Sequence, residues 1–209
     1  MIRAYDNMYL DGAMRNLGAM FDYAVNAAGL PLSQFSRMFT ASEVARRFGK
    51  GHPRYLAGLS GIELARFVIQ ETLDKQVLEE PFPAIRLSPE YWAGWALAYL
   101  QWYTGLPFSR LALDGISAET LALRYYPLHE ADMTKVLSEF LPRVKSPATR
   151  LKEARKHLRL TQADLADRAG VSLRMIRAYE QGTQDLAKAE AATVAALART
   201  LHCEVEGLV

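Results

Sequence analysis

Residues 151–182 read LKEARKHLRLTQADLADRAGVSLRMIRAYEQG, and this stretch carries most of the information about the fold. Thr161 and Ser172 are residue types that cap helix N-termini, and each precedes a run with helical spacing. Gly170 stands between the two runs, where a sharp turn with a positive φ is easy only for glycine. The stretch therefore predicts three helices, over 151–159, 162–168 and 173–181.

The third of these predicted helices has two different faces. Ile176 and Tyr179, three residues apart, are expected to face inward. Arg174 and Arg177 fall on the opposite side, where arginine can pair bidentately with guanine in a DNA major groove. The outward face also holds Ala178 and Gln181, with Leu173 at its border.

Positive charge is concentrated in the same region. Residues 143–177 hold 10 Lys/Arg and 3 Asp/Glu, a net charge of +7, whereas residues 1–142 carry −2 and residues 178–209 carry −3. Neutralising phosphates is the largest general contribution to DNA binding, so this block is a candidate DNA-binding surface. Within it, Lys152 and Lys156 are candidates for contact with phosphates.

The segment resembles the lambda-repressor-like helix-turn-helix, the XRE family. The matching residues are Thr161-Gln162, Leu165-Ala166, Gly170-Val171-Ser172, Ile176 and Glu180-Gln181-Gly182. The resemblance implies a five-helix domain that binds double-stranded DNA, commonly as a homodimer. It also implies that Arg155 and Glu180 form a partly buried ion pair that locks the helices together.

The same resemblance implies particular DNA contacts. Gln162 is expected against the DNA backbone or a base edge, and base contacts map to Leu173, Arg174 and Ala178. Because Leu173 and Ala178 are apolar, they can touch a thymine methyl group but cannot read a base by hydrogen bonds. Ser172 completes the set of candidate DNA-binding residues. A protein-interaction module that no longer binds DNA stays open as an alternative.

Two prolines mark a boundary between domains. Pro142 and Pro147 lie five residues apart and would break a continuous helix across them. The charge changes sign at the same place. The sequence therefore predicts a first domain over 1–141, a linker over 142–148 and the DNA-binding domain over 149–209.

The first domain is expected to be built from helices. Apolar residues at three- and four-residue spacing predict a helix over 14–25, and caps at Ser42, Ser60 and Ser88 predict three more. Two further short helices are expected over 116–124 and 130–141. No alternating strand pattern occurs, so the whole chain is predicted to be all-α.

An aromatic helix is the most distinctive part of this domain. The stretch from Pro89 to Phe108 is apolar, but Glu90, Gln101 and Thr104 interrupt it, so a buried core helix is expected rather than a membrane span. Large aromatic residues can anchor a core or form the hot spot of a partner-binding surface, and both interpretations stay open. The candidates for a partner surface are Tyr91, Trp92, Trp95 and Trp102.

Residues 1–141 offer little that points to catalysis. Four histidines and one cysteine, Cys203, stand at spacings that match no metal site, and no nucleophile with a paired base occurs, so neither a metal, a cofactor nor an enzyme is expected. The basic cluster Arg46, Arg47, Lys50 and Arg54 is interpreted as a solvated helix end, with a second DNA contact as the alternative. No signal-peptide pattern occurs, and a cytoplasmic location is expected.

The whole chain is loosely similar to antitoxin-type regulators, on Tyr91 to Tyr103 and on Arg177-Ala-Tyr-Glu-Gln181. That similarity implies an autoregulatory protein encoded beside a toxin-like partner of ADP-ribosyltransferase fold. The leading hypothesis is a DNA-binding transcriptional regulator whose first domain binds a protein. A ligand-sensing regulator and a protein-only adaptor are the alternatives.

Overall fold

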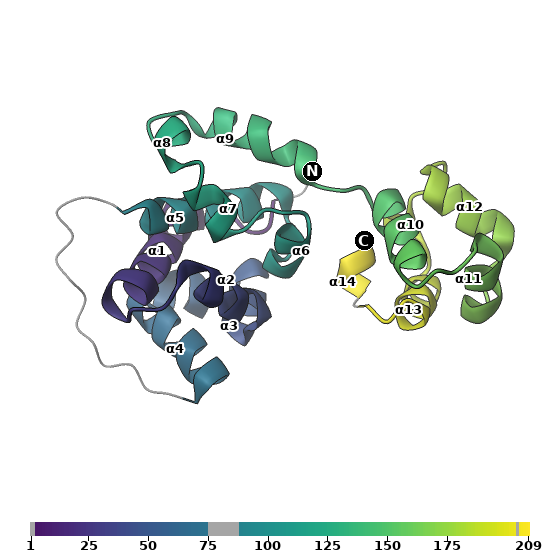
Figure 1. The fold of residues 1–209 in the computed structure, drawn as a ribbon, viewed down its shortest axis with the longest axis horizontal. Coiled ribbons are helices and arrows are strands. Elements are labelled where there is room, and N and C mark those ends of the chain that lie inside the picture. Colours follow the sequence, from purple (N-terminus) through teal and green to yellow (C-terminus); the bar gives the residue numbers. More distant parts are fainter. Residues whose placement is uncertain (1–2, 75–87, 204) are drawn as a thin grey trace. The chain divides into compact units, whose positions relative to one another are not determined.

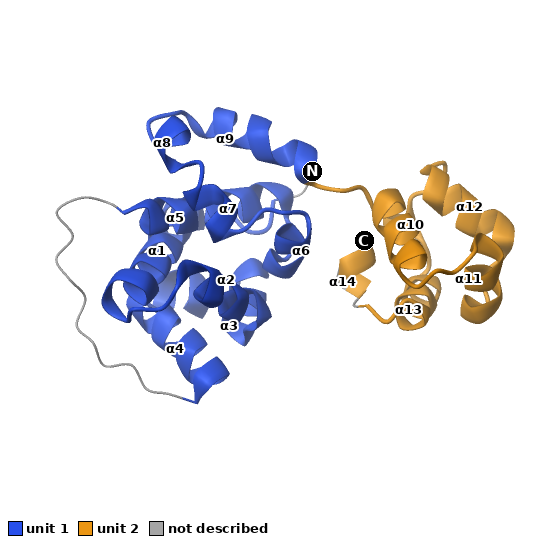
Figure 2. Ribbon diagram, viewed as in Figure 1, with its two compact units in different colours: residues 1–143 blue, residues 144–209 orange. Residues whose placement is uncertain are grey.

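The structure is a computed structural model that describes residues 3–74, 88–203 and 205–209. Every regular element in these ranges is a helix, so the all-α prediction is confirmed for the described part. The chain divides into two compact units, residues 1–143 and residues 144–209 (Figures 1 and 2). The division falls inside the stretch 142–148.

Fourteen α-helices are distributed over the described residues. The first unit contains α1 (Leu10–Asp22), α2 (Leu32–Ala41), α3 (Glu43–Gly49), α4 (Gly61–Leu73), α5 (Pro89–Thr104), α6 (Phe108–Leu113), α7 (Ala118–Ala122), α8 (Tyr125–Leu128) and α9 (Met133–Phe140). The second unit contains α10 (Pro147–His157), α11 (Gln162–Ala169), α12 (Leu173–Gln181), α13 (Ala191–Thr200) and α14 (Val205–Leu208).

Helix α1 packs against both α4 and α5 in the first unit. Two glycines allow this close approach. A Cβ atom on Gly94 of α5 would lie 2.4 Å from the Leu17 carbonyl oxygen, and one on Gly61 of α4 would lie 2.3 Å from the Asn16 carbonyl oxygen. Because no side chain fits in either place, these backbones can meet only at glycine.

The aromatic helix α5 lies largely in the core. Trp92 and Trp102 are 7% and 9% exposed, and the Trp102 Nε1–H donates a hydrogen bond to the Tyr5 carbonyl oxygen at 2.9 Å. Tyr91 and Trp95 are half-buried. Of the two interpretations left open for this helix, burial favours the core for Trp92 and Trp102, while Tyr91 and Trp95 keep part of their surface exposed.

Helix α2 is not expected from the sequence. In the sequence, Pro31 favours the end of a helix. In the structure, it is the N-cap residue of α2. Phe35 and Phe39 of α2 are fully buried, and both rings meet Phe21 edge to face. The short helices α6 and α8 are likewise unexpected, because six and four residues are too few for a periodic pattern.

Helix α10 begins four residues earlier than the sequence predicts, at Pro147 instead of Leu151. The Ser146 hydroxyl accepts a hydrogen bond from the Thr149 N–H at 3.2 Å, and proline fits the first helical position that follows such a cap. The expected linker over 142–148 therefore overlaps the helix. Helix α13 starts at Ala191, after a 3₁₀ turn at Leu186–Lys188.

The second unit has a core of its own, to which each of its five helices contributes. Leu165 and Ile176 are fully buried where α11 meets α12, and Leu197 is fully buried on α13. The short helix α14 is tied to this core by Leu208 and by the buried Arg150, whose Nη1 donates to the Val209 carbonyl oxygen at 2.9 Å. The core holds α11 and α12 in a fixed mutual position.

Candidate nucleic-acid interface

Helices α11 and α12 each begin at a side chain that caps the helix N-terminus. The Thr161 hydroxyl accepts from the Asp164 N–H at 3.1 Å, and the Asp164 carboxylate accepts from the Thr161 N–H at 2.8 Å. Gly170 follows α11 with a φ of 65°, which favours glycine. The Ser172 hydroxyl then accepts from the Met175 N–H at 3.3 Å and starts α12. The observed α12 covers the same residues as the predicted third helix.

Helix α12 divides into a buried face and an exposed face. Ile176 is fully buried and Tyr179 is 5% exposed. On the other side Arg174, Arg177 and Gln181 are exposed. The helix therefore presents two guanidinium groups to solvent. The core of the second unit holds the helix backbone in place.

The remaining sequence-predicted DNA contacts are less uniform. Ser172 is exposed, and its hydroxyl oxygen accepts the cap hydrogen bond of α12 while its hydrogen stays available to donate. Leu173 is half-buried and packs against the core of the unit, and Ala178 is also half-buried. Lys152 and Lys156 extend from α10 and are exposed.

A buried ion pair joins α10 to α12. Arg155 Nε and Nη2 donate to the two carboxylate oxygens of Glu180 at 2.6 and 2.9 Å, and the two side chains are 10% and 3% exposed. Arg155 Nη1 also donates to the Leu160 carbonyl oxygen at 2.7 Å. The structure thus brings together the two residues for which the sequence resemblance implied an ion pair.

Burial and hydrogen bonding oppose each other at Glu180. Burial raises the pKa of this carboxyl group, but hydrogen bonds from Arg155 and Gln162 outweigh it, so the pKa lies below its usual value. The hydrogen bond to Glu180 raises the pKa of Arg155. Both directions indicate a pair in which each side chain is charged.

The structure gives Gln162 a contact that the sequence did not indicate. Its Nε2–H donates to Glu180 Oε2 at 2.9 Å, so one carboxylate serves residues on α10 and α11 at the same time. Gln162 is half-buried. No spacing rule links positions 162 and 180, and only the packed arrangement of the helices brings them together.

The comparisons with known proteins agree with this geometry. Residues 151–208 match the helix-turn-helix family. The second unit is a helix-turn-helix domain. No curated protein and no solved structure matches the chain. Residues 151–208 are therefore an XRE-type helix-turn-helix domain at the C-terminal side of the chain, and such a domain supports a DNA-binding regulator.

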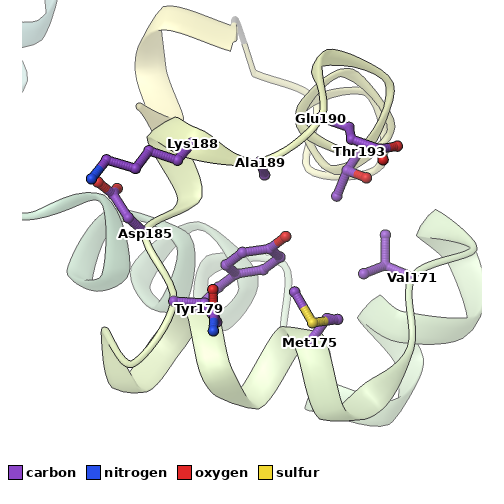
Figure 3. A pocket seen from close by; sticks show the side chains of 9 residues that line it. Val171, Met175, Tyr179, Asp185, Lys188, Ala189, Glu190 and Thr193 are labelled. Atoms are coloured by element: carbon purple, nitrogen blue, oxygen red, sulfur yellow. The ribbon is translucent and has the colours of Figure 1, made fainter.

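A groove lies beside α12 of the helix-turn-helix domain (Figure 3). Its volume is about 610 Å³, and Met175 and Tyr179 line it from α12. Asp185 and Glu190 line it from the segment between α12 and α13. The groove therefore combines Met175 and Tyr179 on α12 with charged side chains of both signs, because Lys188 lines it together with Asp185 and Glu190.

Other candidates from the sequence fall into ordinary structural roles. Arg46 and Arg47 both form ion pairs with Glu43, which lies three and four residues earlier on the same helix. In the described ranges no group of three or more His, Cys, Asp or Glu side chains is placed to hold a metal ion. None of the described helices is long and apolar enough to cross a membrane.

The large apolar side chains that are exposed in the described part of the first unit belong to elements other than α5. Leu123 and Tyr126 are 79% and 85% exposed around the start of α8, and Tyr125 stacks on His129 with ring centroids 4.4 Å apart. Sequence reasoning missed this patch because the surrounding helices are too short to show a periodic pattern. The only sequence signal is the density of aromatic residues in Tyr125-Tyr126-Pro127.

Proposed function

We propose that the protein is a sequence-specific transcriptional regulator that places α12 in the major groove of its operator. The observation that carries the proposal is the pair of exposed arginines, Arg174 and Arg177, on the second helix of the helix-turn-helix. Arginine pairs bidentately with guanine, and each such contact contributes about 1–3 kcal/mol of base discrimination.

The test is selection of a preferred sequence from random DNA, followed by affinity measurement on that operator. Replacing Arg174 or Arg177 by alanine should weaken operator binding by about 5- to 150-fold and relax the preference at one base pair. The matched control is Arg199→Ala, which removes the same charge from an exposed position on α13. Equal losses in all three variants would show that α12 is not the recognition helix.

The basic helix α10 supplies the second part of the proposal. Lys152 and Lys156 are exposed and belong to the block of net charge +7. If they meet phosphates, Lys152→Ala and Lys156→Ala should weaken binding to operator and to unrelated DNA by the same factor. The slope of log binding constant against log salt concentration should also become shallower by about one for each lysine removed.

The first unit is proposed to bind a protein partner, and the regulator to control its own operon in the manner of an antitoxin. The support is the sequence similarity to antitoxin-type regulators, whose neighbour is a toxin-like protein of ADP-ribosyltransferase fold. A tagged pull-down from the native host, after nuclease treatment, tests this proposal. One stoichiometric partner encoded by an adjacent gene would support it, and recovery of the protein alone would contradict it.

A homodimer is proposed for the DNA-bound form. Helix-turn-helix dimers contact two half-sites about 10 base pairs apart, so the selected operator should contain an inverted repeat with that spacing. Sedimentation of the full chain with and without operator DNA measures the stoichiometry. One chain per operator, with a single half-site, would contradict the proposal.

A ligand-sensing regulator is the second candidate, and the groove beside α12 is the observation that favours it. Its volume lies within the range of small-molecule sites. Apolar Val171 and Met175 share it with two carboxylates, Asp185 and Glu190, and one cation, Lys188. The charged lining is thus negative overall, so a molecule with an apolar body and a positive charge fits best. The matched probes are tryptamine and indole-3-acetate, which carry opposite charges. Only tryptamine should shift the Met175 methyl resonance and operator affinity, and no shift with either probe contradicts this function.

A further inference from the structure

The amide of Gln162 is only partly used within the protein. A glutamine amide has two N–H donors and one acceptor oxygen. One N–H donates to Glu180 Oε2 at 2.9 Å, and no other side-chain hydrogen bond of Gln162 occurs among the described residues. One donor and the acceptor oxygen therefore remain for a ligand, at the N-terminal end of α11.

The carboxylate that holds this amide is itself fixed. Arg155 grips both oxygens of Glu180, and the Glu180 side chain is 3% exposed. Arg155 is fixed in turn by its hydrogen bond to the carbonyl oxygen of Leu160, the residue before the cap of α11. Glu180 Oε2 is thus a rigid anchor, because the arginine fork leaves the carboxylate no free rotation.

A free glutamine side chain on a surface must lose rotamer freedom when it binds, and that loss reduces affinity. We propose that Glu180 is a positioning residue for Gln162, which holds the amide in one orientation before DNA arrives. The inference rests on the proposed DNA-binding function. Gln162 then contributes to operator affinity only when Glu180 holds its amide in place. Glu180 itself is buried and does not contact the DNA.

The experiment is a double-mutant cycle on operator affinity in the full chain, with Gln162→Ala, Glu180→Gln and the double variant. An amide at position 180 has no charge and has an NH₂ group in place of one oxygen, so in either orientation it turns N–H donors toward the N–H donors of Arg155 or of Gln162 and cannot hold both as the carboxylate does. Gln162→Ala should weaken binding by about 3- to 10-fold in the wild-type chain and by less than about 2-fold beside Glu180→Gln. Equal losses in the two backgrounds would overturn the proposal.

A control separates positioning from a general loss of stability. Val194→Ala truncates a buried side chain of the same unit that takes no part in this network. In a chain that already carries Val194→Ala, Gln162→Ala should weaken operator binding by the same factor as in the wild-type chain. A reduced cost there as well would assign the coupling to stability and overturn the proposal. If Glu180→Gln fails to fold, Glu180→Asp takes its place, because it keeps the charge but shortens the reach.

A direct measurement on the DNA-free protein completes the test. The two side-chain ¹⁵N–H₂ hydrogens of Gln162 should differ in chemical shift and in exchange rate by more than those of a free glutamine, and the difference should fall to the free-glutamine value in the Glu180 variant. Failure of the inference is distinguishable from failure of the proposed function. A wild-type chain with no operator preference contradicts the function, whereas a chain that prefers its operator and gives additive losses contradicts only the positioning role.

Discussion

Glu180 is the residue on which the helix-turn-helix domain most depends electrostatically. Its buried carboxylate is matched by the guanidinium of Arg155, so the pair is stable only while both side chains are present. Removing one partner of a buried ion pair leaves an uncompensated charge and commonly costs about 3–5 kcal/mol. A single substitution here therefore affects α10, α11 and α12 together.

The first prediction concerns pH. The pKa of Glu180 is lower in the folded domain than in the unfolded chain, where it is about 4.3. Its contribution to stability is therefore complete above that unfolded value and is lost as the pH falls through it toward the folded pKa. Glu180→Gln should lower the unfolding free energy by about 3 kcal/mol near pH 7. The difference from wild type should shrink below about pH 4.

This pH dependence is measured best by far-UV circular dichroism or amide exchange, because all three tryptophans lie in the first unit. The hydrogen bond with Thr161 also lowers the pKa of Asp164. Asp164 therefore also makes the unfolding free energy fall as the pH is lowered. Subtracting the unfolding free energy of Glu180→Gln from that of the wild type at each pH isolates the contribution of Glu180. A difference that stays constant from pH 7 to pH 3 would contradict the prediction.

At the scale of the helix, the crossing of α1 and α5 is one of the two close glycine contacts described above, and it offers a direct test of packing. Gly94→Ala would place a methyl group 2.4 Å from the Leu17 carbonyl oxygen, so the two helices must separate. We expect the unfolding free energy to fall by about 3 kcal/mol or more. Tryptophan fluorescence measures it directly, because α5 carries all three tryptophans.

Gly12→Ala is the matched control for this prediction. Gly12 lies inside α1, and nothing is within 4 Å of a Cβ atom built there. The same substitution should therefore stabilise the unit by up to about 1 kcal/mol, since alanine favours a helix interior over glycine. A loss of stability in Gly12→Ala equal to that in Gly94→Ala would show that packing at the crossing is not the cause.

Helix caps and spacing explain how much of the fold the sequence predicts. Ser60, Ser88, Thr161 and Ser172 each cap the helix that the sequence places after them. Helix α2 escapes prediction because its N-cap residue is Pro31, which makes no side-chain cap hydrogen bond and resembles a helix-breaking position. The short α6 and α8 escape it because tertiary packing, and not a local pattern, makes them helical.

The candidate DNA interface shows the same division between local and non-local information. Exposure of Arg174 and Arg177 follows from helical periodicity alone, and the structure places both on the outer face of α12. The hydrogen bond between Gln162 and Glu180 joins residues 18 positions apart on different helices. No local pattern encodes such a contact, so it becomes visible only after the helices are packed.

At the scale of the whole molecule, the two units have separate cores. We predict that residues 144–209 fold alone and keep the sequence preference of the full chain, because the exposed arginines and the network around Glu180 lie entirely within them. Circular dichroism and operator binding of the isolated segment measure this. An unfolded segment, or a folded one with a different preferred sequence, would contradict the prediction.

The order of the two units along the chain has a consequence for protein synthesis. A ribosome completes residues 1–143 before the 66 residues of the helix-turn-helix unit are made. At about 5–20 residues per second, that interval lasts roughly 3–13 s. Domains tend to fold as they emerge, so the nascent chain can fold its first unit before its DNA-binding unit is complete. A protein that binds the first unit can therefore meet the regulator before any operator can.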